Sequence, residues 1–467
     1  MGTADRASRL PGGSAVMAWF ERFVPRGAIA LSILSLGYFA MGIVRNRVFA
    51  NTYGAGAELD AYNAAFRIPE ILLDVLVAAG LTAPFVPIFS SLRRDAEEGA
   101  NDFGRTVLTA AVGVMAVASL ILFVGAPWLA GIIGASFDPA TKSLYVELLR
   151  INCLAQVMFA ASIALGEILV ANRRFVFYAL APILYTAGII LGTVLFAATY
   201  GIVATAWGAV AGAAAHLAIR AVGTLRTSFR IRPMFRIHTA AFREFIRLMI
   251  PRMISSPIEP LIFTYFTVLA TSLGVGSVSS VNFAADYQVV PVSLIGVSFS
   301  LAVFPTLSAA YADGEHARFT GLLRRNLIVI AALTTLSAAM LFVLSGKLVE
   351  VLLGGGAFDA EDVERTSAVV AAFAISVPFD ALAYPLSRGL YATHDTARQV
   401  LASFVGLGIV VVASQLLVPT VGILAIPLGY AVGMIAKDGL LAVFLAGRLR
   451  GSWAVRTSPP PTPTPTP

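Results

Sequence analysis

The sequence predicts an all-α polytopic membrane protein, with about twelve transmembrane helices in two six-helix lobes around a central cavity. Three observations predict this fold: an apolar composition, a series of apolar stretches and an internal repeat. The 467 residues are 58% hydrophobic and only 13% charged, whereas a soluble domain has about 25% charged residues. A soluble core cannot absorb so much apolar surface, so the chain must cross a bilayer repeatedly.

A spanning helix needs about 20 predominantly apolar residues, and the sequence contains twelve such stretches. They lie near 27–50, 61–92, 106–136, 144–170, 175–199, 201–224, 244–273, 280–310, 323–353, 366–392, 398–419 and 421–447. Arginines gather before the first stretch, in every second connection and after the last stretch. Because basic residues mark the cytoplasmic side of a membrane, both termini are expected in the cytoplasm.

The predicted parts follow from this pattern. They are a cytoplasmic segment 1–26, an N-lobe 27–224 (spans 1–6), a basic cytoplasmic linker 225–243, a C-lobe 244–448 (spans 7–12) and a disordered Pro/Thr tail 449–467. The linker is predicted to be a helix lying on anionic lipid headgroups. This assignment also accounts for the net charge of +7, so no nucleic-acid partner is expected.

An internal repeat relates the two halves. GEILVANRRFVFYALAPI (166–183) aligns with SRGLYATHDTARQVLASF (387–404), and GIVATAWG (201–208) with GILAIPLG (422–429), both at an offset of 221 residues. The stretch around Pro87 aligns with the stretch around Pro305 at an offset of 218. Each half holds an even number of spans, so the halves are parallel repeats, an arrangement found in transporters with a central cavity.

Polar residues inside the second span fall on one helical face. Asn63, Arg67, Glu70 and Asp74 follow steps of 4, 3 and 4, which places them in one stripe of a 3.6-residue helix that Pro69 is expected to bend. Charges in a bilayer are costly and normally face a cavity or one another. The stripe is therefore predicted to line water.

Further charges lie in other spans. Arg45 and Arg47 are two residues apart, so only one of them can face a cavity squarely. Arg220, Arg388, Lys437 and Asp438 are interpreted as neutralising pairs or as side chains near helix ends. The candidate substrate-binding residues are Arg45, Arg47, Asn63, Arg67, Glu70, Asp74, Arg252 and Asp286.

The run RNRVFANTYGAGAELDAYNAAFRIPEILLDVLVAAGLTAPFVPIFSSL (45–92) resembles the N-terminal signature of the MurJ/MviN lipid II flippases. Residues 281–308, 344–362 and 242–253 are similar to the eighth helix, a late loop and the mid-chain linker of that family. The chain departs from the family pattern at Phe39, Leu73 and Asp286, where family members typically carry arginine.

The resemblance implies the fold of the MOP exporter superfamily and a place in the bacterial inner membrane. It implies movement of an undecaprenyl-pyrophosphate-linked peptidoglycan precursor from the inner to the outer leaflet by alternating access. The partners would be this lipid-linked glycan and the membrane lipids, and the protein would act as a monomer. Arg45 and Arg67 would contact the pyrophosphate, since arginine binds such groups through two parallel hydrogen bonds.

Three other functions stay open: a flippase for another polyprenyl-linked glycan, a cation-coupled small-molecule exporter, and a transport-dead scaffold that binds a glycolipid. An enzyme is not expected, because the sequence has no nucleotide-binding glycine loop, metal-ligand cluster or nucleophile–base pair. The single cysteine, Cys153, excludes an internal disulfide. No cofactor or metal site is predicted, and a coupling cation is left open.

Overall fold

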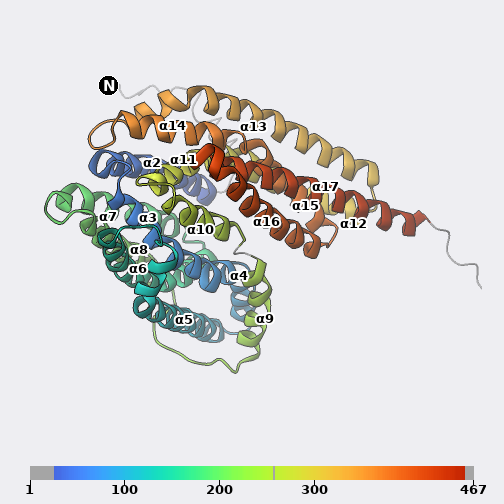
Figure 1. Ribbon diagram of the computed structural model, residues 1–467. Helices are drawn as coiled ribbons and strands as arrows, with labels where there is room; N and C mark the ends of the chain where they lie inside the picture. The colour runs from blue at the N-terminus through green and yellow to red at the C-terminus, as the bar shows by residue number, and fades with distance from the viewer. Residues whose placement is uncertain (1–25, 256–257, 458–467) are drawn as a thin grey trace, which may run out of the picture. The chain divides into compact units, whose positions relative to one another are not determined.

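The computed structural model describes residues 26–255 and 258–457. Within these ranges the regular structure is helical, apart from one isolated β-bridge between Gly355 and Phe358 (Figure 1). The helices are α2 (Arg26–Tyr53), α3 (Ala57–Leu73), η1 (Asp74–Ala78), α4 (Ala79–Asp95), α5 (Glu97–Ile132), α6 (Pro139–Ala171), α7 (Phe175–Tyr200), α8 (Ile202–Leu225), α9 (Ala240–Ser255), α10 (Ile258–Thr271), α11 (Ser277–Pro291), η2 (Val292–Val297), α12 (Ser298–Ala312), α13 (His316–Leu352), α14 (Ala360–Ala374), α15 (Val377–Ala392), α16 (Thr396–Val421), η3 (Gly422–Leu424) and α17 (Ala425–Thr457).

The predicted spans fall on these helices, and the all-α membrane fold is confirmed. Among the described residues, eight helical stretches are long and apolar enough to cross a membrane, and the last of these, Thr396–Arg450, contains α16 and most of α17. Several helices begin earlier than the apolar pattern indicated. For example, α5 begins at Glu97 and α13 at His316, because a helix that leaves the bilayer can continue through polar residues.

The chain separates into two compact units by its internal contacts. The first contains residues up to Arg45, Leu72–Ile121 and Ile151–Arg252, and the second contains Asn46–Ile71, Leu122–Arg150 and the chain from Met253 onward. The second unit therefore includes segments from the N-terminal half of the sequence. The lobe boundaries 27–224 and 244–448 stay a prediction.

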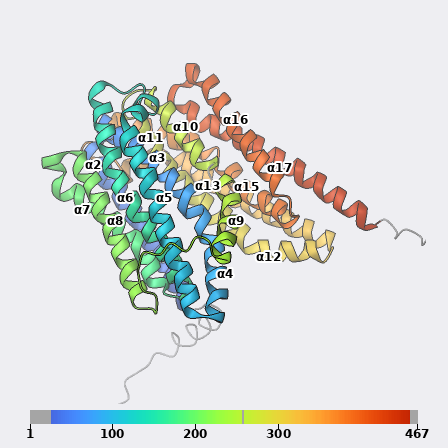
Figure 2. The ribbon, with the colours of Figure 1, turned by 90° about the horizontal axis from the view of Figure 1, so that it is seen from below.

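Each unit has an apolar core. In the first unit, Phe85, Phe89 and Phe103 pack with residues of α6 and α9. In the second unit, Phe319, Leu390 and Leu441 join α13, α15 and α17. α7 and α8 run side by side in the first unit, and α16 and α17 do so in the second (Figures 1 and 2).

The internal repeat is confirmed by backbone conformation. Gly201 ends α7 with φ 57° and ψ −148°, and Gly422, 221 positions later, ends α16 with φ 56° and ψ −130°. Arg173 (φ 57°) and His394 (φ 60°) are the non-glycine residues with positive φ in the described chain, and they too are 221 positions apart. Such values are uncommon outside glycine, so their recurrence at one offset indicates two copies of one backbone path.

A π-helical turn recurs at the second offset. η1 begins at Asp74 and η2 at Val292, 218 positions later. A proline precedes each turn, Pro69 in α3 and Pro291 at the end of α11. Proline removes a backbone donor and breaks the regular ladder of hydrogen bonds. α3 continues through Pro69 to Leu73, and the irregular turn begins only at Asp74. π-turns of this kind are frequent at functional sites.

The basic linker is not the predicted helix. Residues after Leu225 are irregular until α9 begins at Ala240. Phe229 is buried against Gly104 of α5, the Arg105 side chain donates to the carbonyl of Arg230 at 2.9 Å, and Asp102 pairs with Arg236 at 2.7 Å. These contacts with α5 replace helical hydrogen bonds, so the linker docks on protein. Its contact with headgroups stays a prediction.

The predicted terminal segments, 1–26 and 449–467, lie largely outside the residues that the structure describes. The N-terminal segment lies outside the described residues up to position 25. α17 runs to Thr457, past the predicted start of the tail at 449, and the rest of the tail lies outside the described residues.

Candidate functional site

The N-terminal part of α3 packs against the first turns of α11 within the second unit. The Asp60 carboxylate accepts hydrogen bonds from the backbone N–H of Gly276 at 2.6 Å and from the N–H and hydroxyl of Ser279 at 2.7 and 2.6 Å. The first N–H groups of a helix lack partners within the helix and carry a partial positive charge. Asp60, at 1% exposure, therefore caps α11 from a neighbouring helix.

Two of the predicted site residues continue this contact. Arg67 donates from Nη2 to Oδ1 of Asn282 at 2.7 Å, and its guanidinium carbon lies 5.9 Å from the centre of the Phe263 ring. Asn63 lies one turn earlier, with its amide nitrogen 3.5 Å from the Ser279 hydroxyl. Both side chains are half-buried. The predicted polar face of the second span is thus real, but a polar stretch of α11 covers part of it.

The end of α2 adds a second polar contact in the same unit. The amide of Asn46 donates to Oδ2 of Asp286 at 2.9 Å, and Arg47 donates from Nη1 to the Val351 carbonyl at 3.2 Å. Asp286 is exposed and Arg47 half-buried. Of the predicted site residues, the second unit thus holds Arg47, Asn63, Arg67, Glu70 and Asp286.

The other predicted site residues belong to the first unit. These are Arg45, which is half-buried, and Asp74 and Arg252, which are exposed. Glu70 of the second unit is exposed as well. The α-helix ends at Leu73, and Asp74 begins the π-turn. The 3.6-residue spacing that placed Asp74 on the polar stripe therefore ends before this residue.

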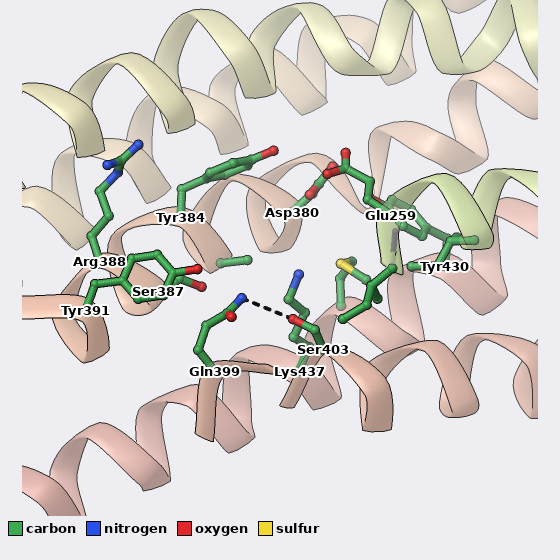
Figure 3. A pocket seen from close by; sticks show the side chains of 14 residues that line it. Glu259, Asp380, Tyr384, Ser387, Arg388, Tyr391, Gln399, Ser403, Tyr430 and Lys437 are labelled. Carbon is green, nitrogen blue, oxygen red and sulfur yellow. Dashed lines mark hydrogen bonds between the residues drawn. The ribbon is translucent and has the colours of Figure 1, made fainter. Parts of the chain in front are cut away.

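A cavity of about 310 Å³ lies inside the second unit, between α10, α15, α16 and α17 (Figure 3). Its charged lining residues are Glu259, Asp380, Arg388 and Lys437. Asp380 accepts a hydrogen bond from Gln288 at 2.9 Å. This volume lies within the range of roughly 300–1,000 Å³ typical of small-molecule pockets.

The sequence-based interpretation is wrong for Lys437, which lies in the middle of α17, whereas Arg388 lies about one turn from the end of α15, as interpreted. Both line the cavity, and in the described part of the chain neither forms an ion pair. The guanidinium of Arg388 instead lies 5.5 Å from the centre of the Phe304 ring. A signal was present in the sequence, because Asp380, Tyr384 and Arg388 recur every four residues on one face of a span.

The comparisons identify the family. The model of the family "Lipid II flippase MurJ" matches residues 49–456, most of the chain. The protein belongs to the MurJ family. The resemblance found in residues 45–92 is thereby confirmed, and the protein is a multi-pass bacterial membrane protein.

Curated MurJ relatives align over almost the whole chain. The lipid II flippase MurJ of Burkholderia cenocepacia is 26% identical over 438 residues, which cover 91% of this chain and 84% of the relative. A probable lipid II flippase MurJ of Thermotoga maritima is 26% identical over 423 residues, which cover 90% and 85%.

Two solved structures share the fold. A lipid II flippase MurJ in an inward closed conformation matches with a TM-score of 0.76 at 21% identity, over 91% of this chain and 90% of that one. An inward-facing MATE-family multidrug resistance transporter of the MOP superfamily matches with a TM-score of 0.78 at 11% identity, over 92% and 100%. The MurJ fold and the MOP architecture predicted from the sequence are confirmed.

Proposed function

We propose that this chain moves lipid II across the bacterial cytoplasmic membrane, from the inner to the outer leaflet. The observation that supports this most strongly is the family match over residues 49–456, which spans both copies of the internal repeat. Lipid II joins a polyprenyl chain to a glycopeptide through a pyrophosphate. The headgroup must therefore be carried past the hydrocarbon by polar and cationic groups, while the chain stays in lipid.

Arg67 is the one basic residue of α3. It is half-buried, held by Asn282 at 2.7 Å, and its Nε atom is buried without a partner. A guanidinium that still has a free donor can bind a phosphate oxygen without giving up its anchor. In our proposal Arg67 and Arg45 contact the pyrophosphate, and Arg47 and Arg252 add positive charge.

The α3–α11 contact supplies a seal in this proposal. The connection 55–60 is predicted to be external, which places Asp60 and its partners toward the outer face. Closing this contact would expose the substrate path to the cytoplasm, and opening it would release the headgroup outside. The proposed cycle works as a monomer with both termini in the cytoplasm and needs no cofactor.

Complementation tests the function directly. The chain is expressed in a bacterium depleted of its own lipid II flippase, and membrane insertion is verified by immunoblot. Growth and normal cell shape are expected. Well-inserted protein that fails to rescue would reject lipid II as the substrate and favour a different lipid-linked glycan or a scaffold without transport.

A second arm tests the coupling. Flipping is measured in proteoliposomes with and without a proton or sodium gradient, and with an amphipathic organic cation as a competing cargo. Gradient-driven export of the organic cation without flipping of lipid II would favour a small-molecule exporter on the same scaffold.

A further inference from the structure

The cavity of the second unit has two chemically different ends. Figure 3 shows Glu259, Asp380 and Tyr430 together at one end, and Arg388 with Ser387 and Tyr391 at the other. Lys437 lies between these groups, near Gln399 and Ser403, which are joined by a hydrogen bond of 3.2 Å. The two carboxylates and the two cations balance formally, but they are separated along the cavity.

The charged groups of the cavity keep unused hydrogen-bonding capacity. In the described part of the chain, Lys437 donates no hydrogen bond, and the Nε atom of Arg388 is buried without a partner. Glu259 likewise has no hydrogen bond or ion pair there, although Asp380 and Lys437 are close enough to affect it electrostatically. A buried donor without a partner, such as the Nε atom of Arg388, is costly unless a ligand completes it.

The internal repeat shows that this cavity is not a general property of the fold. In the first unit, 221 positions earlier, Phe159 stands where Asp380 lies and Tyr185 stands where Gly406 lies. The ring of Phe159 packs 4.8 Å from that of Tyr185 and 5.1 Å from that of His216, which corresponds to Lys437. Aromatic rings thus occupy this place in the first copy.

The first copy is also closed from a second side. Arg220, which corresponds to Leu441, donates to the Ser162 carbonyl at 3.0 Å and lies over the Tyr178 ring at 4.6 Å. In the second copy, a carboxylate and a glycine replace two rings and a leucine replaces the arginine. Lys437 packs against Gly406 in the space that the rings fill in the first copy. A Cβ added to Gly406 would lie only 3.1 Å from the Cβ of Lys437. The same residue differences between the two copies therefore create both the cavity and its charged lining.

We propose that this cavity binds a zwitterionic peptide segment of the cargo headgroup. The ammonium group lies against Glu259 and Asp380, and the carboxylate lies against Lys437 and Arg388. This inference rests on the proposed function for its cargo, since the glycopeptide of lipid II carries amino and carboxyl groups. Hydrogen bonds between opposite charges are strong and oriented, so the cavity distinguishes a peptide-bearing headgroup from a bare sugar.

Binding is measured first, without any flipping. Isothermal titration calorimetry on the purified full-length protein uses a free alanyl-alanine dipeptide and its N-acetylated and C-amidated forms. The free dipeptide is expected to bind, and each blocked form to bind about tenfold or more weakly. Lys437→Met and Glu259→Gln are expected to weaken binding similarly, whereas Lys347→Met, at an exposed lysine of the same unit, leaves it unchanged.

Absence of binding to the wild-type protein, or equal binding of the blocked dipeptides, would overturn the proposal. A circular-dichroism melting curve of each variant identifies a loss of fold. If Lys437→Met does not fold, the comparison of free and blocked dipeptides on the wild-type protein still tests the proposal.

Transport then separates this inference from the proposed function. Proteoliposomes receive a polyprenyl-pyrophosphate disaccharide with or without its peptide. Lys437→Met is expected to slow the peptide-bearing lipid about tenfold or more and to leave the peptide-free lipid within about twofold. Equal slowing of both lipids would overturn the inference and assign the cavity to cation coupling. A wild-type protein that moves neither lipid refutes the proposed function. The dipeptide titration then still tests, independently of transport, whether the cavity binds a zwitterion.

Discussion

Asp60 of α3 accepts two hydrogen bonds from Ser279 of α11, one from its backbone N–H at 2.7 Å and one from its hydroxyl at 2.6 Å. The two residues are 219 positions apart and come from opposite halves of the sequence, yet they lie in one compact unit. A helix start capped by a buried carboxylate of another helix holds the two segments together only while that carboxylate stays in place.

Asp60→Ala is expected to destabilise the protein by about 2–3 kcal/mol, because it leaves the buried N–H groups of Gly276 and Ser279 without an acceptor. Thermal unfolding of the detergent-solubilised protein measures the effect. Asp95→Ala, at an exposed aspartate at the end of α4, should change stability by less than about 0.5 kcal/mol. Equal effects of the two substitutions would show that the cap contributes nothing.

A cysteine pair at Asn63 and Ser279 tests whether the α3–α11 contact must open during transport. In a Cys153→Ala background, oxidation of Asn63→Cys/Ser279→Cys is expected to form a cross-link and abolish flipping, and reduction to restore it. The single variant Asn63→Cys, treated in the same way, serves as the control. Full flipping by the cross-linked protein would contradict the assignment of this contact as a seal.

Arg67→Ala is expected to reduce flipping at least about tenfold, since it removes a charge-assisted contact to the pyrophosphate. The flipping rate of Arg67→Lys should fall between those of the wild type and Arg67→Ala, because lysine keeps the charge but lacks the planar guanidinium that makes two parallel hydrogen bonds. Initial rates in proteoliposomes with matched protein amounts give the comparison. Arg94→Ala, at an exposed arginine at the end of α4, is the control, and an Arg67→Ala rate equal to its rate would exclude Arg67 from the substrate path.

The contact between α7 and α8 depends on glycine. A Cβ at Gly212 would lie 2.4 Å from the carbonyl oxygen of Tyr185, whereas a Cβ at Gly113 of α5 meets nothing within 4 Å. Gly212→Ala is therefore expected to cost about 1–3 kcal/mol through forced separation of the two helices. Gly113→Ala should be neutral or slightly stabilising, since alanine favours helix over glycine. Melting temperatures of both variants check the difference.

The linker attachment should weaken in acid. A hydrogen bond from Arg105 lowers the pKa of Glu98 from its usual value of 4.5. Because the folded-state pKa is the lower one, the stabilisation is present above pH 4.5 and is lost as the pH falls through the lowered value. The difference in melting temperature between wild type and Glu98→Gln should therefore shrink below pH 4.5. A difference that stays constant with pH would assign no role to the Glu98 charge.

The fold could be predicted from the sequence because its causes are local. Apolar stretches of about 20 residues define spans, and the repeat at offsets of 218 and 221 was readable around Pro87 and Gly201. The helix expected for the linker is not formed, because basic residues interleaved with aromatic ones do not reveal that Phe229 is buried against Gly104 of α5.

The candidate site was predictable only in part. Asn63 and Arg67 share a face because the helix is regular there, but Asp74 belongs to a π-turn whose position depends on packing around Pro69. The cavity charges Glu259, Asp380 and Lys437 come from three different helices. Single-sequence patterns show which face of one helix is polar, and they do not show which faces meet.

The length of α13 has a consequence for the surface of the protein. Its 37 residues form a rod about 55 Å long, whereas the hydrocarbon core of a bilayer is about 30 Å thick. α5, its counterpart in the first copy, has 36 residues. With moderate tilt, roughly the first third of each rod extends beyond the hydrocarbon. On α13 this part carries Arg318 into water, whereas on α5 it gives the irregular linker a rigid surface that buries Phe229.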